Sequence, residues 1–95
     1  MLESVIESYL VKEVKSTGGE VRKFVSPGRR HAPDRIVLYP QGRIRFVECK
    51  APGKKPRAGQ VREHARLRKM GFVVEVIDCH DDVDRLVYEM TGDGT

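Results

Sequence analysis

Two segments rich in β-branched and aromatic side chains, residues 35–39 and 43–49, are joined by Pro40-Gln41-Gly42. Such residues favour strands, and a three-residue connection with glycine in the left-handed position is a common hairpin loop. We therefore predict an antiparallel hairpin. A hairpin fixes which residues face one another, and a shift of one residue would turn every side chain to the opposite face of the sheet.

The loop length sets Asp34 opposite Glu48 at the open end of the hairpin. Two apolar pairs on the same face lead up to them, Leu38 with Ile44 and Ile36 with Phe46. Because side chains alternate along a strand, Lys50 lies on the face of Glu48, whereas Cys49 points to the other face. The register therefore predicts an apolar face that carries three charged side chains at its end.

Asp34, Glu48 and Lys50 have the chemistry that metal-dependent hydrolysis of a phosphodiester requires. Facing residues lie about 4.5–5.5 Å apart at Cβ, so two carboxylates can share one cation, and Mg²⁺ prefers oxygen ligands. A lysine beside them can orient a nucleophilic water or offset charge on the phosphate. The plain alternative, a turn aspartate and an exposed Glu-Lys pair, does not explain why charges end an apolar face. Short charged motifs are common in a chain that is 34% charged, so the argument depends on the register.

The net charge of +4 is unevenly distributed along the chain. Residues 43–70 hold ten lysines and arginines against two glutamates, whereas residues 75–95 hold seven acids against Arg85. The basic segment predicts a surface for a polyanion, with a merely solvated face as the alternative. Tryptophan is absent and other aromatic residues are few, so we expect binding through phosphate contacts and duplex shape.

The length of 95 residues indicates one small domain, which we place at residues 1–90, with 91–95 as a disordered tail. The first ten residues are amphipathic and carry acids, so we expect no signal peptide, no membrane span and a cytoplasmic location. Two cysteines without ligand spacing predict reduced thiols. Lys54 and Lys55 lack the setting of a phosphate-binding loop, so no nucleotide cofactor is expected.

The remaining apolar periodicity predicts three helices and two further strands. They are a helix from residue 2 to about 16 ended by Gly18-Gly19, a strand at 20–25, a helix from about Gly59 to Lys69, a strand at 72–77, and a helix N-capped by Asp81 or Asp82 that runs through Glu89. A helix separates the last two strands of the order α-β-β-β-α-β-α, so these strands should run parallel. The expected fold is α/β, a mixed central β-sheet flanked by helices. Helix capping also explains the acidic cluster at residues 78–82 more simply than a metal site does.

Longer strings of the sequence resemble one nuclease family. They are SPGRRHAPDR at 26–35, FVECKAPG at 46–53, Gln60, and LRKMGFVVEV at 67–76. With Asp34, Glu48 and Lys50, they are similar to the virus-type replication-repair nuclease domain, VRR-Nuc, of the PD-(D/E)XK nuclease superfamily. The resemblance covers nearly the whole chain and implies a restriction-endonuclease-like core in a stand-alone phage or bacterial protein.

The resemblance also implies an activity. It points to a Mg²⁺- or Mn²⁺-dependent, structure-selective DNA endonuclease of a bacterial or phage-infected cell, similar to archaeal Holliday junction resolvases. Relatives of this kind cut branched DNA as homodimers. Two alternatives stay open: a flap- or nick-directed nuclease that acts as a monomer, and a DNA-binding module that keeps the fold without chemistry.

Four positions of the hairpin match the family's catalytic residues. The resemblance makes Asp34 and Glu48 metal ligands, adds the backbone carbonyl of Cys49 as a further ligand, and makes Lys50 the catalytic lysine. Side-chain alternation agrees with this placement for the three charged residues.

The family's helix-borne glutamate matches either Glu3 or Glu7. We prefer Glu7 as the catalytic residue, because an apolar set follows it along the helix as in the resolvases. Gln60 matches a glutamine that is common in related nucleases, and His64 stands where some relatives carry a tyrosine. The residues expected to contact DNA are Arg29, Arg30, Lys54, Lys55 and Gln60.

Overall fold

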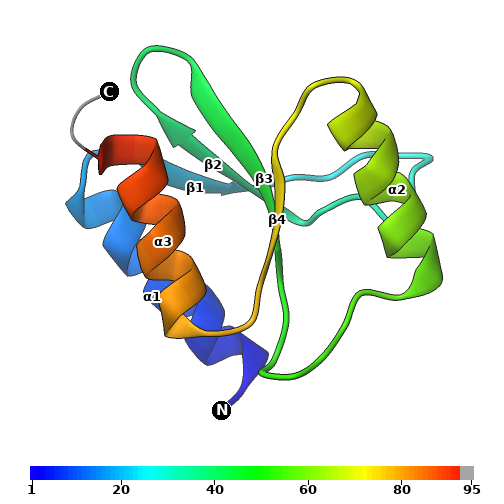
Figure 1. Cartoon of the computed structure of the whole chain (residues 1–95), viewed down its shortest axis with the longest axis horizontal. Coiled ribbons are helices and arrows are strands. Elements are labelled where there is room, and N and C mark those ends of the chain that lie inside the picture. The colour runs from blue at the N-terminus through cyan, green and yellow to red at the C-terminus, as the bar shows by residue number, and fades with distance from the viewer. Residues whose placement is uncertain (93–95) are drawn as a thin grey trace.

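The computed structural model describes residues 1–92, which contain three helices and four strands (Figure 1). In chain order they are α1 (Glu3–Ser16), β1 (Glu20–Lys23), β2 (Arg35–Tyr39), β3 (Arg43–Cys49), α2 (Ala58–Lys69), β4 (Val74–Ile77) and α3 (His80–Thr91). This order confirms the predicted α-β-β-β-α-β-α arrangement. Within residues 1–92, no helix has the length and apolar character needed to cross a bilayer.

The strands form a four-stranded sheet in the order β1-β2-β3-β4. The first three strands are antiparallel neighbours, whereas β3 and β4 are parallel, as the helix between them requires. Figure 1 shows α1 and α3 on one side of the sheet and α2 on the other. The fold is therefore the expected mixed sheet flanked by helices.

The hairpin of β2 and β3 has the predicted register. Ile36 faces Phe46 across the two strands, and the pairing continues to Arg35 with Val47 at the open end. Gly42 has the left-handed φ of +74° that a loop of this kind favours. The neighbouring Gln41 shares this conformation, with φ of +71°, which the sequence pattern did not indicate.

The main core lies between the sheet and the pair of helices α1 and α3. Its buried apolar side chains include Ile6, Leu10 and Val14 of α1, Val37, Val47, Cys49 and Ile77 of the sheet, and Val83, Leu86 and Met90 of α3. The α1 residues recur every four positions, so one stripe of that helix faces the sheet. Each large side chain buried in this way contributes about 1.5–3 kcal/mol. This layer is therefore the main source of stability.

A smaller apolar cluster lies on the opposite face of the sheet, beneath α2. Phe46, Leu67 and Val74 are buried there, with Phe24 and Ile36 packed against them. The rings of Phe24 and Phe46 meet edge to face, with centroids 5.2 Å apart. This cluster is the apolar part of the hairpin face that leads to Asp34 and Glu48.

The last strand is shorter than predicted, because β4 begins at Val74 and not at residue 72. Gly71 and Phe72 instead donate backbone hydrogen bonds to carbonyls of the last turn of α2, at 2.9 and 3.1 Å. Such an ending, with φ of +97° at Gly71, is a Schellman motif. The predicted strand is therefore wrong for Phe72 and Val73, which are 42% and 43% exposed.

The expected N-cap of the last helix is also wrong. Cys79 occupies the N-cap position of α3, and Asp81 and Asp82 lie in the first helical turn. The carboxylate of Asp82 reaches back to the backbone N–H of Asp78, with Oδ2 3.2 Å from that nitrogen. An acid in the first turn can satisfy a free backbone donor without standing at the cap.

Two element ends differ from the sequence-based expectation. β1 ends at Lys23 and does not reach residue 25. Thr91, which was expected in a disordered tail, is the last residue of α3, and its hydroxyl donates a hydrogen bond of 2.6 Å to the carbonyl of Val87. The rest of the expected tail, residues 93–95, lies outside the described part of the chain.

Gly19 gives a stability prediction. A Cβ at this position would lie 2.8 Å from the carbonyl oxygen of Leu38, from the ring of Tyr39 and from the side chain of Val14. Because these atoms are packed and one belongs to the backbone, we expect Gly19→Ala to lower the free energy of unfolding by about 1–3 kcal/mol. Urea denaturation should show this loss, whereas the exposed helix substitution Lys12→Ala should change stability by less than about 0.5 kcal/mol. Equal stability of the two variants would contradict the packing.

Candidate active site

The open end of the hairpin holds the three charged residues that the register brings together. The ladder of β2 and β3 ends at Arg35 and Val47, so Asp34 and Glu48 are the next facing positions, and Lys50 follows on the same face. The backbone is fixed on both sides: the carbonyl of Asp34 accepts a 3.0 Å bond from the N–H of Phe24, and the N–H of Lys50 donates at 2.8 Å to Ile77 in β4. The site therefore stands on hydrogen-bonded strands.

The two carboxylates each present an oxygen that has no hydrogen-bond partner. Glu48 is only 6% exposed, and Asp34 is half-buried. Oδ1 of Asp34 and Oε1 of Glu48 are buried and unpaired among the described residues. Burial, opposed only in part by the guanidinium of Arg35, raises the pKa of Asp34. Burial and the charge of Asp34 together raise the pKa of Glu48.

Unpaired buried carboxylate oxygens are costly, and a hard divalent cation would offset that cost. Asp34 and Glu48 thus fit a Mg²⁺ or Mn²⁺ ion by the chemistry and the burial of their unpaired oxygens. The side chain of Cys49 lies in the main core on the other face, where burial raises the pKa of the thiol to about 12. Only the backbone of Cys49 is therefore suited to face the site, as side-chain alternation predicts.

Gln60 joins the first turn of α2 to the hairpin. Its Oε1 accepts hydrogen bonds from Nζ of Lys50 at 3.0 Å and from the backbone N–H of Arg57 at 2.9 Å. Its Nε2 donates to Oε2 of Glu48 at 3.2 Å, and Nζ of Lys50 lies 3.7 Å from that same oxygen. The amide of Gln60 thus holds Lys50 and Glu48 in place. Its expected contact with DNA stays a prediction.

A glutamate of α1 approaches the site from the other side of the sheet. Glu7 forms an ion pair with Arg35, whose guanidinium lies 3.8 Å from Oδ2 of Asp34 and donates to the carbonyl of Asp34 at 3.0 Å. The charge of Glu7 raises the pKa of Asp34, and the charge of Glu3 acts in the same direction on Glu48. Both acids are near the site, so the choice of Glu7 stays a prediction.

Arg35 is a component of the site that sequence reasoning missed. The only sequence signal for this role is its position directly after Asp34. Side-chain alternation turns Arg35 toward α1, where it pairs with Glu7.

His64 was also not predicted to be buried. It is 1% exposed, its Nε2 is unpaired among the described residues, and burial lowers its pKa. The spacing of Gln60, His64 and Leu67 along α2 is the pattern that indicates one inward face.

A second group of possible ligands lies at the turn between β4 and α3. One ligand atom each of Asp78, Cys79 and Asp82 lies within 4.8 Å of the others. Both carboxylates are already engaged, because Asp78 accepts from the N–H of Gly53 at 3.1 Å and Asp82 accepts from the N–H of Asp78. These bonds explain the cluster as a structural turn.

The other expected DNA-contacting residues lie on loops. Arg29 and Arg30 are exposed in the segment before β2, and Lys54 and Lys55 are exposed between β3 and α2. Arg29 is paired with Glu63 of α2, with 3.5 Å between Nη1 and Oε1. The two loops that carry these basic side chains lead into β2 and out of β3, the strands whose ends carry Asp34 and Glu48.

Comparison with known proteins places this geometry in a family. No protein-family model matches the sequence. The sequence is 58% identical over 79 residues to "Putative nuclease p44" of Acyrthosiphon pisum secondary endosymbiont phage 1, covering 83% of this chain and 85% of that protein. A solved structure described as "VRR_NUC domain" superposes with a TM-score of 0.84 and 39% sequence identity, covering 94% of this chain and 97% of the other. The chain belongs to the VRR-Nuc family of nucleases.

Proposed function

We propose that this nuclease is a Mg²⁺- or Mn²⁺-dependent, structure-selective DNA endonuclease that resolves four-way junctions as a homodimer. The observation that carries the metal dependence is the pair of buried, unpaired oxygens on Asp34 and Glu48, with Lys50 beside them. Paired carboxylates next to a fixed lysine are an arrangement that suits metal-dependent hydrolysis of a phosphodiester. The resemblance to archaeal resolvases supports the choice of substrate.

In this proposal, Asp34, Glu48 and the carbonyl of Cys49 would hold the metal ion. The bound ion would supply Lewis acidity toward the scissile phosphate and would lower the pKa of a coordinated water. Lys50 keeps its ammonium group beside Glu48, where it orients the attacking water and offsets negative charge that develops on the phosphate. Gln60 holds the side chains of Lys50 and Glu48 in fixed positions relative to each other through its two hydrogen bonds. Glu7 is the glutamate that α1 contributes to the proposed catalytic set, and its ion pair with Arg35 connects it to Asp34.

Binding of DNA is proposed to rest on phosphate contacts. Arg29, Arg30, Lys54 and Lys55 are exposed around the site, and Gln60 lies at its edge. A relative from a phage supports a place of action in the cytoplasm of a bacterium or a phage-infected cell. The candidates that compete with junction cleavage are a monomeric nuclease directed to flaps or nicks, and a DNA-binding module without activity.

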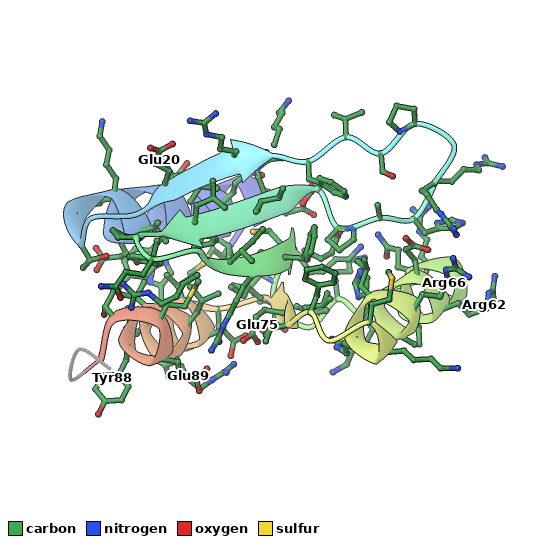
Figure 2. The ribbon with its side chains drawn as sticks, turned by 90° about the horizontal axis from the view of Figure 1, so that it is seen from above. Glu20, Arg62, Arg66, Glu75, Tyr88 and Glu89 are labelled. Atoms are coloured by element: carbon green, nitrogen blue, oxygen red, sulfur yellow. The ribbon has the colours of Figure 1, made fainter. Side chains whose placement is uncertain are left out.

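The three hairpin residues give the first test. Glu48→Gln, Asp34→Asn and Lys50→Ala should each lower the cleavage rate at saturating DNA by about a hundredfold or more, because the first two remove a proposed metal ligand and the third removes the ammonium group beside the reacting phosphate. Junction binding, measured without cleavage, should stay nearly unchanged. Glu20→Gln, which alters an exposed acid labelled on β1 in Figure 2, is the control and should keep full activity. Near-normal cleavage by one of the three variants would remove that residue from the mechanism.

The raised carboxyl pKa values predict how metal binding depends on pH. Because the folded protein binds these two protons more tightly than the unfolded chain, the stability they contribute without metal is greatest at acidic pH and is lost as pH rises through the raised pKa values. At neutral pH we therefore expect Mn²⁺ to raise the Tm, and at mildly acidic pH we expect a smaller shift, since protons compete with the ion.

Thermal unfolding with Mn²⁺ and with a chelator measures this effect. Asp34→Asn and Glu48→Gln should abolish the shift, whereas Asp78→Asn should retain it. If Asp78→Asn removes the shift and the other two variants do not, the metal site lies at the turn between β4 and α3.

Substrate and assembly are tested together. Matched four-way, flap, nicked and linear duplexes should be offered with Mg²⁺ or Mn²⁺, and the four-way junction should be cut fastest. A two-fold dimer supplies two symmetric sites, so the protein should sediment at about twice 10.8 kDa and should release paired nicks on opposing strands. A monomer that nicks one strand near a flap would leave the nuclease assignment and remove the junction assignment. A complete lack of cleavage with retained binding would favour the silent module.

A further inference from the structure

A hollow of about 310 Å³ lies between the loop that precedes β2 and the outer face of α2. Four arginines line it, two from each side. The loop contributes Arg29 and Arg30, and α2 contributes Arg62 and Arg66. Figure 2 labels Arg62 and Arg66 on α2. Arg62 and Arg66 stand four residues apart, so they lie on one face of the helix.

One carboxylate organises this group without neutralising it. Oε1 of Glu63 lies 3.5 Å from Nη1 of Arg29 and 3.5 Å from Nε of Arg66. Glu63 is therefore a brace between the loop and the helix. Within residues 1–92, Arg30 and Arg62 form no ion pair, and four guanidinium groups against one carboxylate leave the hollow strongly positive.

A close approach of the loop to the helix builds the hollow. A Cβ at Gly59 would lie 2.5 Å from the ring of His31, so only glycine allows this ring to rest on the first turn of α2. His31 forms one wall of the hollow. The four arginines are thus brought together by tertiary packing, because Arg30 and Arg62 are far apart in the sequence.

The same helix connects the hollow to the candidate active site. Gln60 faces Glu48 and Lys50, whereas Arg62 and Arg66 continue along the opposite face of α2. With a rise of 1.5 Å per residue, Arg66 lies about 9 Å farther along the helix axis than Gln60. The hollow and the candidate site therefore lie on different faces of α2, so one DNA molecule that passes this helix can contact both.

We infer that this hollow binds a backbone phosphate of the DNA that flanks the scissile phosphate. Guanidinium groups suit this ligand because their planar donors match phosphate oxygens in pairs. The inference rests on the proposed function, since it takes the anion to be part of the same DNA. It adds Arg62, Arg66 and the brace Glu63 to the residues that position the substrate.

The test compares two double variants that remove the same net charge. Arg62→Gln with Arg66→Gln changes the hollow, whereas Lys12→Gln with Lys15→Gln changes exposed lysines of α1, on the other side of the sheet. Affinity for a labelled DNA junction is measured by fluorescence anisotropy in a chelator, so that no cleavage occurs, over a series of salt concentrations. Loss of two phosphate contacts should lower the slope of log affinity against log salt by about 2 for the hollow variant. The control should keep the slope of the unchanged protein.

The double variant also removes the ion pair between Arg66 and Glu63, so a third variant tests the hollow without breaking that ion pair. Arg30→Gln removes a guanidinium that forms no ion pair among the described residues, so it should lower the slope by about 1 while the fold is undisturbed. Equal slopes for the hollow variants and the α1 control would overturn the inference. The binding assay needs no metal, so it is independent of the nuclease proposal. If the nuclease proposal fails, the protein will not cleave DNA, but substitutions in the hollow will still lower the slope of log affinity against log salt.

Discussion

The antiparallel register of β2 and β3 is the constraint on which the site depends. It places Asp34 beside Glu48 and turns Lys50 to the same face, while Cys49 enters the main core. A slip of one residue would exchange these faces, burying charge in the core and exposing apolar side chains. The left-handed Gly42 in the hairpin loop and the apolar pairs along the strands hold this register.

The candidate site lowers the stability of the metal-free protein. Two carboxylates with raised pKa values and unpaired oxygens destabilise the metal-free fold, and such costs are tolerated where the rest of the structure compensates. The compensation comes from the core between the sheet and the helices α1 and α3, which lies on the opposite face of the same strands. The sheet thus separates the main core from the candidate active site.

Ion pairs and side-chain hydrogen bonds also hold the helices against the sheet. Nη1 of Arg45 on β3 lies 2.7 Å from both Glu75 on β4 and Glu89 on α3, and both glutamates are labelled in Figure 2. On the other face, Gln60 fastens α2 to the hairpin through Lys50 and Glu48, and Glu63 fastens it to the loop before β2. These polar contacts add to the apolar packing of Leu67 against Phe46 and Val74.

The sequence by itself determined the hairpin, its register, the helix ends at Gly18 and Gly71, and the gathering of Asp34, Glu48 and Lys50. These features follow from local rules, namely turn chemistry and the alternation of side chains along a strand. The family resemblance supplied Gln60 as a residue of interest but not its contacts. Tertiary structure alone decided that Gln60 braces the lysine, that His64 is buried, that Arg35 links Asp34 to Glu7, and that four arginines meet across a hollow. Each of these depends on how closely two separate elements approach, and packing over the whole fold sets that distance.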